Sequence, residues 1–104
     1  MTRSTSKPKR LEPIHPGEIL AEDFMAPRGL TANRLALELR VPANRLTEVI
    51  RGRRSISADT ALRLARYFDT SSELWLGLQI EYDLRVARHN LGKRIEREVT
   101  TARG

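Results

Sequence analysis

Two short amphipathic segments that lie almost end to end constrain the fold more than any other feature of this sequence. Residues 31–39 and 42–51 each repeat their apolar side chains at helical spacing, and only two residues separate them. Thr31 is a favourable N-cap for the first segment. Pro42 suits the first position of the second segment, and Gly52 follows its last turn. Two helices joined by so short a turn predict a helix-turn-helix.

The second segment has an apolar side and a polar side. At 100° per residue Leu46, Val49 and Ile50 share the apolar side, which we expect to be buried. Asn, Arg and Glu side chains can hydrogen-bond the edges of adenine, guanine and cytosine in the major groove, so the polar side predicts a DNA-reading surface. An ordinary solvated face is the alternative. The residues expected at base edges are Ala43, Asn44, Thr47, Glu48 and Arg51.

The net charge of +6 is unevenly distributed along the chain. Residues 40–66 carry seven arginines against two acids, whereas the blocks 11–39 and 67–87 are each net negative by three charges. Positive charge beside a reading helix indicates phosphate contacts, and the arginines at 51–54 form a turn suited to them. A solvated basic loop is the alternative. The residues expected to bind phosphate are Thr31, Asn33, Arg45, Arg53 and Arg54.

The remaining chain predicts three more helices and two flanking segments. The first helix begins after His15, which we expect to cap it, and runs to about residue 25. Another spans residues 57–68, with Ser57 as its cap and an apolar side of Ala61, Leu62, Leu64, Ala65 and Phe68. Residues 1–10 predict a disordered basic arm and residues 89–104 a charged tail, weakly helical or disordered, on either side of a domain at 11–88.

The fifth helix, from Ser71 to about Arg88, starts with a predicted capping box of Thr70 and Glu73 and shows two apolar stripes. The first stripe consists of Leu74, Trp75, Leu78, Tyr82 and Val86, and the second of Leu76, Ile80, Leu84 and Ala87. So small a domain can bury only one of them well. The other predicts a twofold dimer interface, and the sequence leaves open which stripe takes which role.

Several function classes lack support in the sequence. There is no cysteine, and the two histidines, His15 and His89, lie near no carboxylate cluster or candidate nucleophile, so we expect no catalytic residue, metal or cofactor. No apolar run approaches the roughly 20 residues of a membrane span, and the N-terminus lacks a secretory signal. We therefore expect a cytoplasmic protein without a membrane or small-molecule substrate as partner.

Five sequence motifs, in this order, resemble the HigA-type antitoxins of the phage-repressor-like (Xre/Cro type) helix-turn-helix family. They are His-Pro-Gly-Glu-Ile-Leu at 15–20, Val-Pro-Ala-Asn-Arg-Leu at 41–46, the stretch 51–65, Trp-Leu-Gly-Leu-Gln at 75–79 and Tyr-Asp-Leu at 82–84. One departure is Arg40, in a turn where such domains often place glycine. The resemblance implies an all-α, five-helix domain with a short C-terminal extension.

The same resemblance implies a dimeric repressor of its own operon that binds a palindromic operator on double-stranded DNA and neutralises a HigB-type mRNA-cleaving toxin. The acidic residues around the first helix, Glu12, Glu18, Glu22 and Asp23, are the expected docking surface, because a basic toxin would be repelled by residues 40–54. Two alternatives remain: a stand-alone helix-turn-helix regulator without a toxin, and a small enzyme or RNA-binding protein, which has the weaker support.

Overall fold

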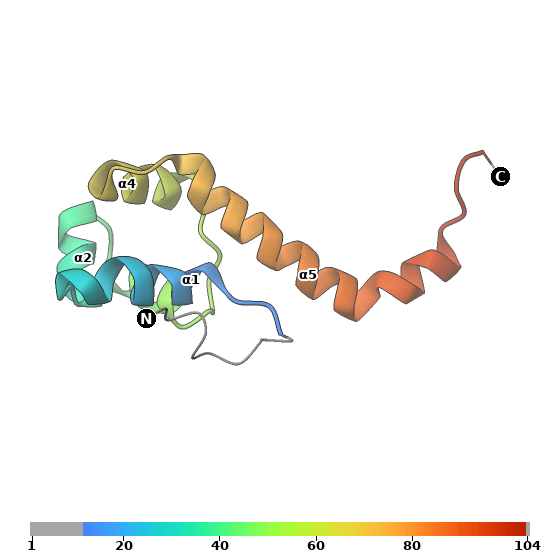
Figure 1. Ribbon diagram of the computed structural model, residues 1–104, viewed down its shortest axis with the longest axis horizontal. Helices are drawn as coiled ribbons and strands as arrows, with labels where there is room; N and C mark the ends of the chain where they lie inside the picture. The colour runs from blue at the N-terminus through green and yellow to red at the C-terminus, as the bar shows by residue number, and fades with distance from the viewer. Residues whose placement is uncertain (1–11, 104) are drawn as a thin grey trace, which may run out of the picture.

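The computed structural model describes residues 12–103, which fold into the expected all-α architecture without a strand among them (Figure 1). The predicted arm at residues 1–10 lies outside this range. The helices are α1 (Pro16–Ile19), continued by a π-helix (Leu20–Met25) and a 3₁₀ turn (Ala26–Arg28), then α2 (Ala32–Leu39), α3 (Ala43–Ile50), α4 (Ala58–Phe68) and α5 (Ser72–Glu98). No helix in the described range is long and apolar enough to cross a membrane.

Side-chain caps fix where α1, α2, α4 and α5 begin, whereas α3 begins at Ala43, directly after Pro42, without one. His15 Nδ1 accepts from the Gly17 amide at 2.9 Å, and the hydroxyls of Thr31 and Ser57 accept from amides three residues ahead, so these three predicted caps are confirmed. The predicted capping box of helix five is wrong. Ser71 caps α5, while the Thr70 hydroxyl accepts from the Trp75 indole nitrogen at 2.9 Å, because burial of that ring requires a partner for its N–H.

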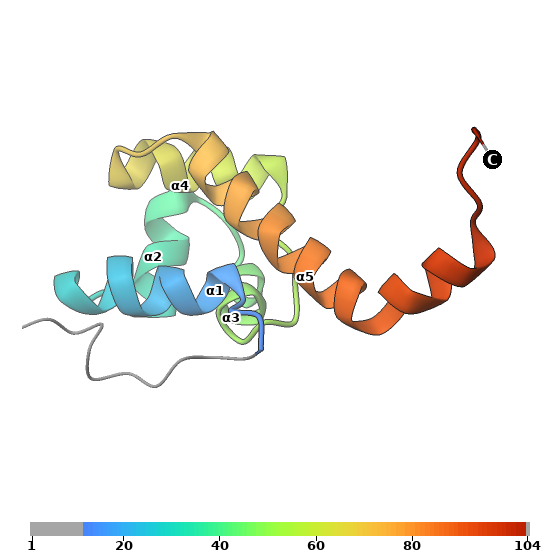
Figure 2. The ribbon, with the colours of Figure 1, turned by 45° about the vertical axis from the view of Figure 1, so that its right-hand side comes forward.

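The core lies where α1, α2, α3 and α4 converge on the start of α5 (Figure 2). Trp75 is fully buried, with the Phe24 ring 4.8 Å from its own. Leu62, predicted to be buried, is instead 62% exposed, because the inner side of α4 runs through residues 61, 64, 65 and 68. The other buried apolar side chains are Leu20, Met25, Leu35, Ala36, Leu39, Leu46, Val49, Ile56, Ala61, Leu64, Ala65 and Phe68.

Helix α5 is longer than expected and resolves the question of the two stripes. It continues to Glu98, and its second half projects away from the body of the domain (Figures 1 and 2). The stripe that includes Trp75 faces the core, although its Leu74 is exposed. Of the second stripe Leu76 packs against the core, whereas Ile80 is 58% exposed and Leu84 44%. The exposed apolar stripe thus begins at Ile80.

Candidate DNA-binding surface

The turn between α2 and α3 has helix-turn-helix geometry. Arg40 adopts the left-handed conformation, with φ 62°, and its amide donates to the Leu37 carbonyl at 3.2 Å. The Val41 amide donates to the Ala36 carbonyl at 3.0 Å, which completes a Schellman motif. Arginine here costs about 1 to 2 kcal/mol of backbone strain that glycine would avoid. The neighbouring hydrogen bonds hold the turn in place despite this cost.

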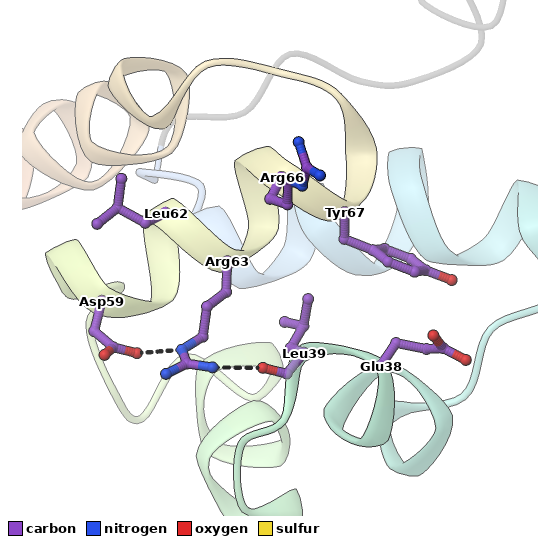
Figure 3. Close-up of a pocket in the computed structure, with 7 residues that line it drawn as sticks. All are labelled: Glu38, Leu39, Asp59, Leu62, Arg63, Arg66 and Tyr67. Atoms are coloured by element: carbon purple, nitrogen blue, oxygen red, sulfur yellow. Dashed lines mark hydrogen bonds and ion pairs between the residues drawn. The ribbon is translucent and has the colours of Figure 1, made fainter.

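Arg63 of α4 fastens the end of α2 to the rest of the domain (Figure 3). Its guanidinium donates to the Leu39 carbonyl at 2.8 Å and to the Asp59 carboxylate at 2.8 Å. The first bond satisfies a carbonyl that helix termination leaves without an intrahelical partner. Arg63 also lines a cavity of about 400 Å³ between α2 and α4. Arg63 therefore stabilises the turn between α2 and α3, which determines the orientation of α3.

Helix α3 is held from behind by a close approach of α1. A Cβ atom at Gly17 would lie 1.8 Å from the Val49 carbonyl oxygen and 2.9 Å from the Ile50 Cα. Only glycine allows the two backbones to approach this closely. Leu46 and Val49 are fully buried on the same inner side of α3, as predicted, and Ile50 is partly buried. One side of α3 is therefore fixed against the core.

The residues predicted to read bases lie on the opposite side of α3 or at its end. Ala43, Asn44 and Arg51 are exposed, and Thr47 and Glu48 are partly exposed. The Thr47 hydroxyl donates to the Ala43 carbonyl at 3.1 Å, which leaves its oxygen lone pairs and its methyl group for a ligand. The reading face, defined as these five residues, is thus accessible.

The residues predicted to bind phosphate differ in their present partners. Arg45 donates to Asp59 at 2.9 Å, and Arg54 Nε and Nη2 lie 3.0 and 2.9 Å from Glu48 Oε1. Arg53 is exposed, and no carboxylate within residues 12–103 pairs with it. Thr31 is exposed and uses its hydroxyl as the α2 cap, and Asn33 is exposed in the first turn of α2.

The carboxylates among these arginines change the electrostatics of the surface. Hydrogen bonds and charge from Arg63, followed by those from Arg45, hold the pKa of Asp59 below its usual value. Two of the predicted phosphate ligands, Arg45 and Arg54, are therefore partly neutralised in the absence of DNA. They line a depression of about 400 Å³ at the start of α4, together with Ser55, Ser57, Asp59 and Thr60.

A further contact at this surface was missed by sequence reasoning. The buried Gln79 of α5 accepts from the Ile56 amide at 2.8 Å, across 23 residues of chain. The helical wheel placed Gln79 between the two apolar stripes, and nothing local indicated a partner in the loop. The only available signal was the position of Gln79 one helical turn after Trp75, on the side of α5 that carries the tryptophan.

No metal-binding cluster accompanies this surface in residues 12–103. No three His, Cys, Asp or Glu side chains there are grouped to hold a metal ion. His15 is engaged as a helix cap, with its ring 4.8 Å from that of Tyr82. Partial burial lowers the pKa of His15, and the nearby Asp83 charge opposes that shift.

Comparison with known proteins decides the family. The helix-turn-helix family HTH_3 matches residues 22–75, which include α2, α3 and α4. The chain belongs to the helix-turn-helix family. Virulence-associated protein I from Dichelobacter nodosus is 49% identical over 77 residues, which are 74% of this chain and 71% of that protein.

Solved structures place this helix-turn-helix protein near the HigA antitoxins. An addiction module antidote protein of the HigA family from Coxiella burnetii is 53% identical with a TM-score of 0.83 and covers 88% of this chain and 99% of its own. The Pseudomonas aeruginosa antitoxin HigA with the higBA promoter is 45% identical, with a TM-score of 0.85 and the same coverage. The resemblance inferred from the sequence motifs is confirmed, and the chain is a HigA-like DNA-binding helix-turn-helix protein.

Proposed function

We propose that this protein acts in the cytoplasm as a homodimeric repressor that binds a palindromic operator in its own operon. Its reading face contacts base edges in the major groove, while Thr31, Asn33, Arg45, Arg53 and Arg54 contact phosphates. The observation that carries the proposal is an accessible polar side of α3, fixed from behind by α1 and followed directly by exposed arginines. The likeness to a HigA antitoxin whose structure includes promoter DNA supports it.

Mutation separates the base contacts from the phosphate contacts. Footprinting on the DNA upstream of the gene first locates the operator. Asn44→Ala should then cost about 1 to 3 kcal/mol of binding free energy and relax the preference at one base pair. Arg53→Ala should weaken binding to all sequences alike and reduce the salt dependence by about one unit. An unchanged sequence preference in Asn44→Ala would refute the base-reading assignment.

We further propose that the protein is the antitoxin of a HigB-type mRNA-cleaving toxin and contributes no catalytic group of its own. Like charges should keep a basic toxin away from the arginines of α3 and the following loop. The acidic side chains of the first helical segment, Glu18, Glu22 and Asp23, are the better match, with Glu12 just before it. A solubilising acidic surface is the competing explanation of the same residues.

Charge reversal tests the docking surface directly. The triple variant Glu18→Lys, Glu22→Lys, Asp23→Lys should lose co-purification with the toxin and fail to rescue growth, while operator binding is retained. Co-purification equal to the parent would exclude this surface. If the parent itself neither binds nor counteracts a ribonuclease encoded beside its gene, the alternative of a stand-alone regulator is favoured.

A further inference from the structure

Gln79 is one of two polar side chains that are buried within residues 12–103, and it is 5% exposed. Its Oε1 accepts from the Ile56 amide at 2.8 Å, and its Nε2 donates to Asp83 Oδ1 at 3.0 Å. An ionised aspartate only accepts hydrogen bonds, so Asp83 determines which end of the amide faces the loop. The pair therefore presents a fixed acceptor to the backbone of a distant segment.

That segment is the basic loop, residues 51–55, with its continuation into α4. At its start the amides of Gly52 and Arg53 donate to carbonyls of α3 at 3.0 and 2.8 Å. At its end Ile56 is buried and Ser57 caps α4. The arginines between these anchor points are exposed. The Gln79 contact anchors this end of the loop from α5, outside α3 and α4.

We propose that Gln79, oriented by Asp83, is a positioning residue for DNA binding: it fixes the backbone of the basic loop so that Arg53 and Arg54 meet the phosphates. This inference rests on the phosphate role proposed above for that loop. Gln79 itself is buried behind the loop and touches no DNA. Its effect on binding must therefore pass through the arginines that it positions.

A double-mutant cycle tests this dependence. Gln79→Met keeps the side-chain volume but removes the acceptor, and it should weaken operator binding about tenfold and reduce the salt slope by about one unit, as Arg53→Ala does. Adding Arg53→Ala to Gln79→Met should then cost little more, whereas adding Asn44→Ala should cost its full amount. Additive losses for Gln79→Met and Arg53→Ala would overturn the proposal.

A swapped pair provides the rescue. Gln79→Glu with Asp83→Asn retains an acceptor for the Ile56 amide and a donor from position 83, so it should recover the salt slope that Gln79→Met loses. A folded swapped pair with the slope of Gln79→Met would also overturn the proposal. Glu81→Gln, which removes an exposed acid of the same helix, is the matched control and should bind as the parent does.

Two further comparisons keep the result decisive. If circular dichroism shows that Gln79→Met does not fold, Asp83→Ala replaces it in the same cycle. This surface change removes the hydrogen bond that orients the Gln79 side-chain amide. It should weaken operator binding less than Gln79→Met, and its effect should again be non-additive with Arg53→Ala. A parental salt slope in Arg53→Ala alone would refute the phosphate role of the loop itself. A reduced slope in that variant with an additive cycle would refute only the role of Gln79.

Discussion

Glu48 is an acidic side chain on a surface that must approach phosphates, and its pairing with Arg54 accounts for this. The ion pair partly neutralises both charges in the absence of DNA. The reading face can therefore carry a cytosine acceptor without a full uncompensated negative charge. Because each partner is about half exposed, the pair contributes little to folding stability. We expect its effect in DNA binding instead.

Replacement of Glu48 by glutamine should lower the specificity for the operator and raise the affinity for DNA of any sequence. Glu48→Gln frees Arg54 for phosphate, so binding to random DNA should strengthen and its salt slope should steepen by up to about one unit. The advantage of the operator over random DNA should shrink. Titrations of both DNAs at several salt concentrations measure the two effects. Glu81→Gln, which frees Arg85 on α5 in the same way, is the control and should change neither.

We expect His15 to make the stability of the first helix dependent on pH. Burial lowers its pKa in the folded state below 6.5, so the unfolded chain takes up the proton first as the pH falls. The neutral ring caps Gly17 through Nδ1, and this contribution is complete above about pH 6.5 and declines below it. His15→Asn keeps a capping oxygen that does not titrate. As the pH falls from about 8 to about 5, the melting temperature of His15→Asn should therefore decrease less than that of the parent. If the melting temperatures of the two proteins changed equally with pH over this range, His15 would be excluded as the titrating group.

Contacts within a few residues could be predicted from the sequence, whereas contacts between segments could not. The caps at Thr31 and Ser57 are local, so residue type and position were sufficient. Whether Thr70 or Ser71 caps α5 depended on the Trp75 indole N–H, which required the Thr70 hydroxyl as its acceptor once the ring was buried. The Glu48 and Arg54 pair joins a helix to a loop whose path the sequence did not specify.

At the scale of the helices, the crossing of α1 over α3 determines how the reading face is held. Gly17→Ala would place a methyl group 1.8 Å from the Val49 carbonyl, and the two helices would have to move apart. We expect a loss of about 3 kcal/mol in the free energy of unfolding and a lower melting temperature. Operator affinity should fall as well, because α3 shifts with its carbonyl.

Gly92→Ala is the matched control for that substitution. Within residues 12–103, no atom outside the neighbouring α5 backbone lies within 4 Å of where a Cβ at Gly92 would be, and the residue is in the interior of α5, so alanine should stabilise the helix by roughly 0.5 to 1 kcal/mol. Thermal melts of both variants compare the effects. Equal melting temperatures for Gly17→Ala and the parent would show that α1 does not hold α3 at this point.

Helix positions were predictable because periodicity, caps and turn residues all lie close in sequence. The length of α5 was not, because residues 89–98 carry few apolar side chains and the helix leaves the core before reaching them. Which of the two stripes is buried was also beyond sequence reasoning. Two apolar stripes on one helix look alike until the position of Trp75 in the core distinguishes them.

At the scale of the whole molecule, the arginine-rich block and the exposed apolar stripe of α5 lie on different parts. The arginine-rich block belongs to α3, the loop after it and α4, whereas Ile80 and Leu84 belong to the part of α5 that leaves the body. A partner that covers α5 can therefore leave the reading face accessible. This separation is what a dimer that binds two operator half-sites requires.

We expect the dimer to form through this exposed stripe and to place two reading faces about 34 to 36 Å apart, one helical turn of DNA. Since Ile80 and Leu84 are exposed in the single chain, Ile80→Asp and Leu84→Asp should stay folded but become monomeric. Operator binding should weaken strongly because each half-site is then bound alone. Leu62→Asp, on an equally exposed leucine of α4, should remain dimeric. Light scattering and circular dichroism measure both properties, and a folded, dimeric Ile80→Asp would exclude this stripe as the interface.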